Sequence, residues 1–320
     1  MAEFATRSAV LVDTVGDAAE QTNTHVSQVF TVSPLDAQAG ELLGLLRSLT
    51  RDPPYKVVVF FVTARLTQMY AEAFGLARMP VLEMHSRKSQ AQRTRVADQF
   101  RDGDNLIMFS SDVSARGMDY PDVTAVIQVG MPSEKAQYVH RLGRTGRAGK
   151  AGGGYLLLTP DESSFLKMVS DLPLTKRPAA CSGSADGLAQ TMVDALERVP
   201  AATKSSAYQA WLGFYNTYTK RLGWSKEECV RNANLFADTV LRLPVPPTLE
   251  ARTVGKMGLS GVRGLLVGGG GGGGKGGGGK GGGGKGGGRS HQGPTKTIDK
   301  RGKGGGGKGG GKGGGKGFRR

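Results

Sequence analysis

The chain has few of the residues that build metal sites and disulfide frameworks. Its 320 residues include two cysteines, Cys181 and Cys229, and four histidines. The cysteines show no metal-ligand spacing, so we expect neither a zinc site nor a disulfide framework, and a reducing compartment is the default. No run of 18 apolar residues occurs, so we expect no membrane span and no membrane partner. The opening 21 residues are too acidic for a transit peptide and lack the apolar core of a signal peptide.

Acidic residues are almost missing from the end of the chain. Residues 268–320 contain 13 of the 43 Lys and Arg but a single acid, Asp299, whereas the preceding residues are close to charge balance with 30 basic and 26 acidic side chains. The Gly/Lys repeats of this tail cannot bury apolar surface, so we expect the tail to be disordered. A polycationic tail fits nucleic acid through salt-dependent phosphate contacts, and it fits an anionic membrane by charge alone. A solvated tail without a role is an equal alternative.

Apolar runs rich in β-branched residues alternate with helical patterns between residues 33 and 180. This alternation predicts βαβ units and a mostly parallel sheet sandwiched by helices. The expected strands are 56–62, 81–86, 105–111, 124–130 and 154–160. The expected helices are 33–50, begun by Ser33 and Pro34, 64–74, 89–103, closed by Gly103, and 133–142, capped by Ser133. Ligands of such sheets lie beyond the carboxyl ends of the strands, which makes 63–65, 111–119 and 143–149 candidate site loops.

Residues 185–267 lose the strand pattern and are predicted to form an α-helical extension. A helix there begins with a capping box, Ser225 and Glu228. Another helix carries apolar residues at intervals of three or four, which indicates one face packed on the sheet domain; an aromatic surface that stacks on bases is the alternative. These residues are Tyr208, Trp211, Tyr215, Tyr218 and Leu222.

Residues 140–147 read "HRLGRTGR" and concentrate positive charge beside an expected buried strand. Arg144 and Arg147 lie three apart with glycines around them, and glycine lets a backbone approach a ligand closely. Two such guanidiniums can meet a polyphosphate and stabilise charge on a transferred phosphoryl group. An arginine-rich surface turn is the alternative from composition alone.

Three further segments precede "HRLGRTGR" in a fixed order: "FFVTAR" (60–65), "MHSRKSQAQR" (84–93) and "SSDVSARGMD" (110–119). Together the four segments resemble the second RecA-like domain of the DEAD-box ATP-dependent RNA helicases of superfamily 2, over residues 20–170. The sequence departs from the usual family pattern at Ser111, where Thr is usual, and at Ser86, where Gly is usual. The extension resembles that of the organellar intron-splicing subgroup, which implies a mitochondrion or chloroplast, with nucleus or cytoplasm left open.

The resemblance implies an ATP site that this chain shares with another domain. Arg144 and Arg147 would be arginine fingers at the γ-phosphate. Asp119 would accept a hydrogen bond from the ribose, and Gly117 would let the backbone come close.

The resemblance also implies RNA contacts and coupling between domains. Thr63, Arg93 and Ser111 would touch RNA phosphates, and the hydroxyl retained at Ser111 makes its substitution mild. His140 would contact the acidic motif of the partner domain, and Arg116 would couple the RNA and ATP sites.

The sequence contains neither a G-x-x-x-x-G-K-[ST] loop nor a D-E-A-D string, and the Gly/Lys tail lacks the Ser or Thr and the flanking strand and helix of a phosphate loop. The phosphate cradle and the Mg²⁺ ligands would lie on a first RecA-like domain absent from this sequence, so we expect a monomeric C-terminal half with no ATP turnover of its own. The alternatives are a non-catalytic RNA-binding module and a regulator of a complete helicase. The expected parts are an interdomain-linker remnant (1–32), the RecA-like domain (33–180), the extension (185–267) and the tail (268–320).

Overall fold

The fold is seen in a computed structural model that describes residues 25–112, 120–179 and 187–268. The chain divides into two compact units, residues 1–272 and 273–320, and all described residues belong to the first. Cys181 and the expected disordered tail beyond Gly268 lie outside the described residues.

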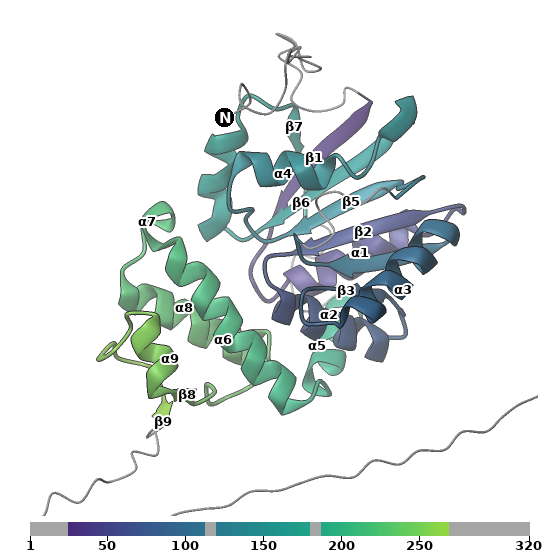
Figure 1. The fold of residues 1–320 in the computed structure, drawn as a ribbon. Coiled ribbons are helices and arrows are strands. Elements are labelled where there is room, and N and C mark those ends of the chain that lie inside the picture. The colour runs from purple at the N-terminus through teal and green to yellow at the C-terminus, as the bar shows by residue number, and fades with distance from the viewer. Residues whose placement is uncertain (1–24, 113–119, 180–186, 269–320) are drawn as a thin grey trace, which may run out of the picture. The chain divides into compact units, whose positions relative to one another are not determined.

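The core of the first unit is a seven-stranded sheet in the order β3-β4-β2-β5-β6-β1-β7, in which every pair of neighbours is parallel (Figure 1). The predicted parallel sheet is therefore confirmed. Strand β2 is buried along its whole length, as its continuous apolar run predicts for a central strand covered on both faces. The strands are β1 (Val26–Val32), β2 (Lys56–Phe61), β3 (Leu82–Met84), β4 (Leu106–Ser110), β5 (Ala125–Val129), β6 (Gly152–Leu158) and β7 (Leu174–Lys176).

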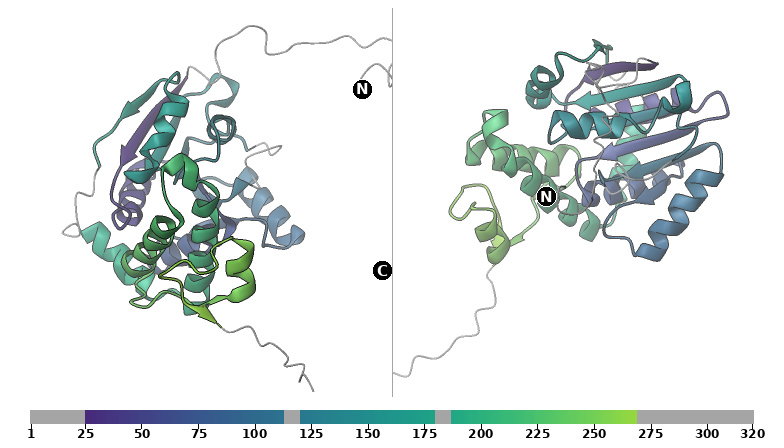
Figure 2. Two further views of the ribbon diagram at one scale, coloured as in Figure 1. Left: turned by 90° about the vertical axis from the view of Figure 1, so that its left-hand side faces the viewer. Right: turned by 45° about the horizontal axis from the view of Figure 1, so that its top comes forward.

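Helices cover both faces of this sheet, which completes the predicted sandwich (Figure 2). Alternate residues of β2 point to opposite faces: Val57 and Val59 pack with α1 and α2, whereas Val58 and Phe60 pack with α3. A third cluster joins α4 and the 3₁₀ helix η4 to β1 and β6. These elements are α1 (Gln38–Leu49), α2 (Ala64–Leu76), α3 (Gln90–Asp102), α4 (Lys135–Leu142) and η4 (Asp161–Val169).

Residues Val26–Val32 form strand β1, although the sequence places them in the linker remnant. The strand pairs in parallel with β6 on one side and with β7 on the other, so it lies inside the sheet. The local sequence of β1 could not predict these partner strands, because both lie more than 100 residues further along the chain.

Two expected helix starts were wrong. Helix α1 begins at Gln38, because the backbone of Ala37 hydrogen-bonds to Pro34 in a separate turn and Ser33 is buried. Helix α4 begins at Lys135 with no side-chain cap at its own N-cap residue. The backbone N–H of Ser133 instead donates to Oε1 of Gln137, at 2.6 Å, so a side chain from inside the helix meets the residue that was expected to cap it.

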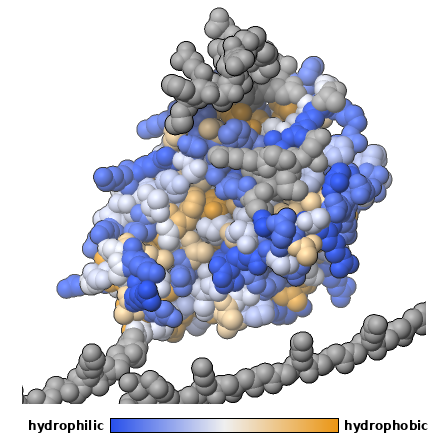
Figure 3. Space-filling model, viewed as in Figure 1, coloured by the Kyte–Doolittle hydropathy of each residue, from blue (hydrophilic) through white to orange (hydrophobic). Residues whose placement is uncertain are grey.

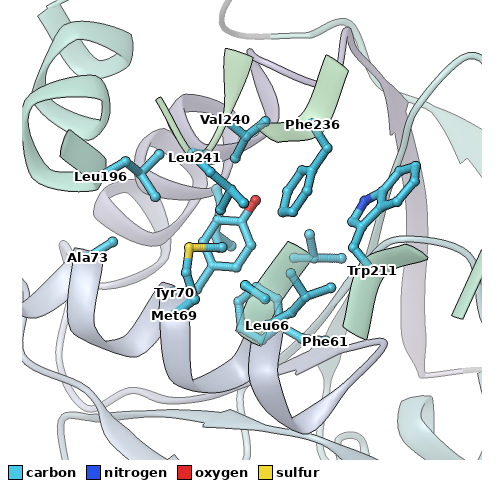
Figure 4. Packing of buried hydrophobic residues seen from close by; sticks show 14 of the residues in the cluster. Phe61, Leu66, Met69, Tyr70, Ala73, Leu196, Trp211, Phe236, Val240 and Leu241 are labelled. Carbon is cyan, nitrogen blue, oxygen red and sulfur yellow. The ribbon is translucent and has the colours of Figure 1, made fainter. Parts of the chain in front are cut away.

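The extension is helical, as predicted, and shares one apolar core with the sheet domain. Helix α5 packs on α1 and α2, and α6 packs on α2 and α8. Figure 4 shows Leu66, Met69 and Tyr70 of α2 facing Trp211 of α6 and Phe236 of α8. The elements are α5 (Gly187–Glu197), α6 (Ala201–Thr217), α7 (Thr219–Leu222), α8 (Lys226–Thr239), α9 (Ala251–Lys256) and the strands β8 (Leu249–Glu250) and β9 (Val267–Gly268).

The aromatic stripe of the extension lies mostly in this core. Tyr208, Trp211 and Tyr215 are all buried, which confirms packing on the sheet domain as the main role of the face. The capping box of α8 is also present, since Ser225 Oγ accepts from the Glu228 backbone and the Glu228 carboxylate accepts from the Ser225 backbone. Within the three described ranges, no helix combines the length and apolarity that crossing a bilayer requires.

One buried carboxylate ties the extension to the sheet domain. Glu162 accepts hydrogen bonds through Oε1 from the backbone of Met131, at 2.7 Å, and from the Tyr215 hydroxyl, at 2.6 Å. Its Oε2 accepts from the backbone and hydroxyl of Thr159. Burial raises the pKa of Glu162, and these four donors lower it only in part. We call Glu162, Tyr215, Met131 and Thr159 the Glu162 node.

Candidate functional site

The expected site residues that the structure describes fall at two opposite edges of the sheet. The strands are parallel, so all their carboxyl ends meet at one edge, called here the carboxyl edge, and their starts meet at the other, the amino edge. Residues 62–63, 85–89, 111–112, 130–134 and 159–161 belong to the carboxyl edge. Residues 54–56, 104, 122–124 and 143–151 belong to the amino edge.

Thr63 and Ser111 lie together at the carboxyl edge. Thr63 follows β2 and caps α2, its hydroxyl accepting from the Leu66 backbone at 3.2 Å. Ser111 follows β4, the strand paired with β2, and its backbone N–H donates to the Met84 carbonyl at the end of β3. The ends of β2, β3 and β4 thus stand side by side, as the sequence predicted for this group.

Arg65 adds positive charge to this edge. Its guanidinium donates to Gln68, at 3.0 Å. Partial burial lowers the pKa of Arg65, and the positive charge of Arg87, which follows β3, lowers it further. Two cations that follow β2 and β3 therefore act on one another here, and the positive potential that they create favours an anionic ligand.

The loop after β3 is held by a buried histidine that sequence reasoning passed over. His85 Nδ1 accepts from the Arg87 backbone, at 3.2 Å, and Nε2 lies 2.6 Å from Glu83 Oε1. Since Nδ1 is the acceptor, Nε2 carries the proton given to Glu83. Burial raises the pKa of Glu83, but hydrogen bonds from His85 and Lys88 bring it below its usual value. The pair holds the backbone of this loop in place.

Arg93 lies in the first turn of α3, just after that loop. A capping box between Ser89 and Gln92 starts the helix. Arg93 Nη2 donates to Gln90 Oε1, at 2.5 Å, and its side chain lines a small hollow of about 190 Å³ between α3 and β3. The structure thus places Arg93 on α3, the helix that follows β3.

Arg144 and Arg147 lie at the amino edge, away from the other candidates. The expectation that the 143–149 loop follows the carboxyl-end rule is wrong, because α4 runs from the carboxyl edge of β5 back to the start of β6. Both arginines are half-buried and line an open hollow of about 400 Å³. Its other charged residues are Lys56, Asp104, Asp122 and Lys150.

The turn that carries these arginines depends on glycines. Gly146 adopts the left-handed conformation, with φ of 68°. A Cβ on Gly152, the first residue of β6, would collide with the Thr145 hydroxyl and lie 2.8 Å from the backbone nitrogen of Gly146. The glycine run that begins β6 therefore lets the arginine turn lie directly on the sheet, while Arg147 Nε donates to the Gly143 carbonyl, at 3.0 Å.

Arg141, the first arginine of "HRLGRTGR", is a buried structural residue. Its side chain is 1% exposed, and Nε and Nη2 lie 2.8 and 2.7 Å from Asp112 Oδ1. Asp112 also accepts from Gln137, at 2.9 Å. Burial lowers the pKa of Arg141, and Asp112 offsets this effect only in part. The pair fastens α4 to the loop that follows Ser111, and the helical spacing of Tyr138, Arg141 and Leu142 is the signal that could have revealed it.

His140 is exposed on the last turn of α4, next to Arg141. Arg116, Gly117 and Asp119, expected near the ribose and between the two sites, lie outside the described residues. Among the residues that the structure does describe, no group of three His, Cys, Asp or Glu side chains could hold a metal ion.

A parallel sheet sandwiched by helices, with polar strand ends at one edge and an arginine turn at the other, is the architecture of a RecA-like domain. Residues 39–149 match the family described as the helicase conserved C-terminal domain. The chain is 46% identical over 256 residues to DEAD-box ATP-dependent RNA helicase 25 of Oryza sativa subsp. japonica, covering 79% of this chain and 42% of that protein. It is 47% identical to helicase 26 of the same species, over 79% of this chain and 47% of that protein.

Solved structures give the same fold. Mss116p bound to single-stranded RNA and AMP-PNP matches with a TM-score of 0.63 and 25% identity, over 77% of this chain and 50% of that one. Domain 2 of Mss116p bound to an RNA duplex matches with a TM-score of 0.63 and 24% identity, over 75% of this chain and 98% of that one, a likeness of fold. The chain thus carries a RecA-like helicase C-terminal domain that is similar to the corresponding part of DEAD-box RNA helicases, and it spans less than half the length of the two rice relatives.

Proposed function

We propose that this chain is the C-terminal half of an ATP-dependent DEAD-box RNA helicase and works with a first RecA-like domain that supplies the phosphate loop and the Mg²⁺ ligands. The observation that carries the proposal is the open hollow lined by Arg144 and Arg147. A closed core around these residues would leave no room for a triphosphate. The hollow instead presents cations on a wall that another domain can complete.

On the ATP side, Arg144 and Arg147 act as arginine fingers. Their guanidiniums stabilise the negative charge that develops on the transferred phosphoryl group. Lys56 and Lys150 add two further cations to the same hollow, and Lys150 is held there by Asp122. Asp119 accepts a hydrogen bond from the ribose and Gly117 lets the backbone come close, as the family resemblance implies. The donor set is cationic and suits a polyphosphate, with Mg²⁺ held by the partner domain.

On the RNA side, Thr63, Arg93 and Ser111 contact phosphates of a single strand. They stand at or just after the ends of β2, β3 and β4, which are neighbours in the sheet. Arg65 joins them as a further phosphate contact, supported by the positive potential that it shares with Arg87.

The two sides communicate through the loop that begins at Ser111. Asp112, the next residue, is bonded to Arg141 and Gln137 of α4, and α4 leads directly to the arginine turn. His140 sits on the exposed end of this helix, where it contacts the partner domain. Arg116 couples the two sites, as the family resemblance implies.

An ATPase assay with single-stranded RNA tests the proposal. The chain alone is expected to show no turnover above background, and turnover is expected once a first RecA-like domain from a relative is joined to it. RNA-stimulated ATP hydrolysis by the chain alone would refute the requirement for a first RecA-like domain. RNA binding without turnover in the joined protein would instead favour a non-catalytic module.

The arginine-finger role is tested by Arg147→Ala in the two-domain protein. Turnover should fall on the order of 10³-fold or more, with RNA affinity nearly unchanged. Arg231→Ala, on the exposed face of α8, is the matched control and should keep full turnover. A loss of RNA affinity with normal turnover would assign Arg147 to RNA instead.

The subgroup and compartment rest on the sequence of the extension. We place the protein with the organellar intron-splicing helicases and therefore in a mitochondrion or chloroplast. Imaging of the fluorescently tagged product of the complete gene tests this, and a signal confined to nucleus and cytoplasm would contradict it.

A further inference from the structure

A second hollow opens at the carboxyl edge, where the sheet domain meets the extension. It has a volume of about 210 Å³ and lies at the ends of β1 and β6, under α6 and α8. Figure 3 shows apolar surface in the middle of this face of the molecule. We call this hollow the aromatic pocket. Its lining residues are Leu35, Pro160, Trp211, Tyr215, Trp224 and Leu235, with Pro34, Thr159, Asp161 and Asn232.

The aromatic pocket lies on the same edge of the sheet as Thr63, with the end of β5 between them. A Cβ placed on Gly130, at the end of β5, would lie 2.9 Å from Val62 and 3.4 Å from the Tyr215 hydroxyl. Val62 precedes Thr63, and Tyr215 lines the pocket. In the sheet, β2 and β6 are separated by β5 alone, a distance of about 10 Å. An RNA strand that contacts Thr63 therefore reaches the aromatic pocket within a few nucleotides.

The walls of the pocket are suited to a flat aromatic ring. The rings of Trp211 and Trp224 are 6.4 Å apart and nearly parallel, at 23°, and Tyr215 lies 5.9 Å from Trp224. Trp224 is half-buried and Leu235 is 49% exposed, so both offer apolar surface to a ligand. The hydroxyl of Tyr215 donates to Glu162, so Tyr215 lines the pocket with its ring.

Polar and charged groups around the opening match a nucleotide. Asp161 and Asn232 supply an acceptor and an amide that can bond the edge of a base. Lys220 and Arg221 lie within four residues of Trp224, and Arg221 donates to the Ser133 carbonyl, which anchors it on the loop after β5. This loop separates the pocket from the strand ends that carry Thr63 and Arg65.

We propose that the aromatic pocket takes one nucleobase of the single-stranded RNA that runs along the carboxyl edge. The inference rests on the proposed RNA-binding function and adds to it a contact with a base, beside the phosphate contacts of Thr63, Arg93 and Ser111. The base stacks against Trp224 while Asp161 and Asn232 meet its edge, and the cations near Trp224 face the adjoining phosphates.

The test compares short oligo(U) RNA with an abasic oligomer of the same length, both binding to the full chain. Trp224→Leu keeps apolar contact with Trp211 but removes the stacking surface. It should weaken oligo(U) binding about ten-fold and leave abasic binding unchanged, because one stacked base contributes roughly this much. Trp224→Phe should retain the preference for oligo(U). Val245→Ala, an exposed apolar residue outside the pocket, is the control.

Each outcome separates the pocket from the proposed function. If Trp224→Leu weakens the binding of both oligomers equally, or of neither, the base-binding role of the pocket is refuted while the RNA-binding function stands. A wild-type chain that binds neither oligomer refutes the RNA-binding function, and the pocket falls with it. Photocrosslinking from 5-bromouridine RNA gives a readout independent of affinity: crosslinks should map to Trp224 or Tyr215, and crosslinks confined to other segments contradict the proposal.

Discussion

The Glu162 node makes a prediction whose size follows from the structure. Tyr215→Phe keeps the buried ring and removes one hydroxyl, which donates to Glu162 at 2.6 Å. A hydrogen bond to a charged acceptor contributes about 1.5–3 kcal/mol, and this acceptor is 1% exposed, so water cannot replace the lost donor. Tyr215→Phe should therefore lower the free energy of unfolding by about 1.5–3 kcal/mol.

A matched control lies on the same helix. The Tyr208 hydroxyl donates to Asn234, at 2.8 Å, and its ring is also buried. This pair is neutral and only part-buried, so Tyr208→Phe should cost about 0.5–1.5 kcal/mol. Urea denaturation followed by circular dichroism gives both values, with unchanged slopes showing that the same surface unfolds. A loss at Tyr215 equal to or smaller than that at Tyr208 would refute the idea that a buried carboxylate fastens the extension to the sheet domain.

Two further substitutions test the arginine turn and the charge of the node. Gly152→Ala should displace the turn that begins at Thr145, costing about 1–3 kcal/mol of stability and most ATP turnover in the two-domain protein, whereas Gly75→Ala, with nothing within 4 Å of its Cβ, should change stability by less than about 1 kcal/mol. Stability of the wild type should decline as pH rises from the ordinary pKa of Glu162, 4.5, toward its raised folded value, because the unfolded chain releases this proton first; Glu162→Gln should remove that decline, and an unchanged pH profile would contradict it.

Local patterns in the sequence predicted the elements that bury their own apolar residues. The run 56–62 predicted a central strand because the residues after Lys56 are all apolar and can be buried on either face. The capping box at Ser225 gave the start of α8 because both of its hydrogen bonds join residues three apart. Thr63 and Ser111 met at one edge because parallel strands end together, which follows from the βαβ pattern.

Features that depend on distant partners could not be predicted in this way. Strand β1 needed β6 and β7 before its alternating pattern had a place in the sheet. Ser33 and Ser133 are good capping residues by type, yet a turn and the side chain of Gln137 shifted both helix starts. A cap is decided by which donor reaches it in three dimensions, and residue type sets only the preference.

The arginines of "HRLGRTGR" show most clearly which features the sequence determines and which depend on the tertiary structure. The sequence by itself determined that "HRLGRTGR" concentrates guanidiniums between glycines. Only the tertiary structure decided that Arg141 turns inward to Asp112 while Arg144 and Arg147 line an open hollow. The physical reason is that burial of a charge depends on a partner that compensates its lost hydration, and Asp112, which follows β4, reaches Arg141 on α4.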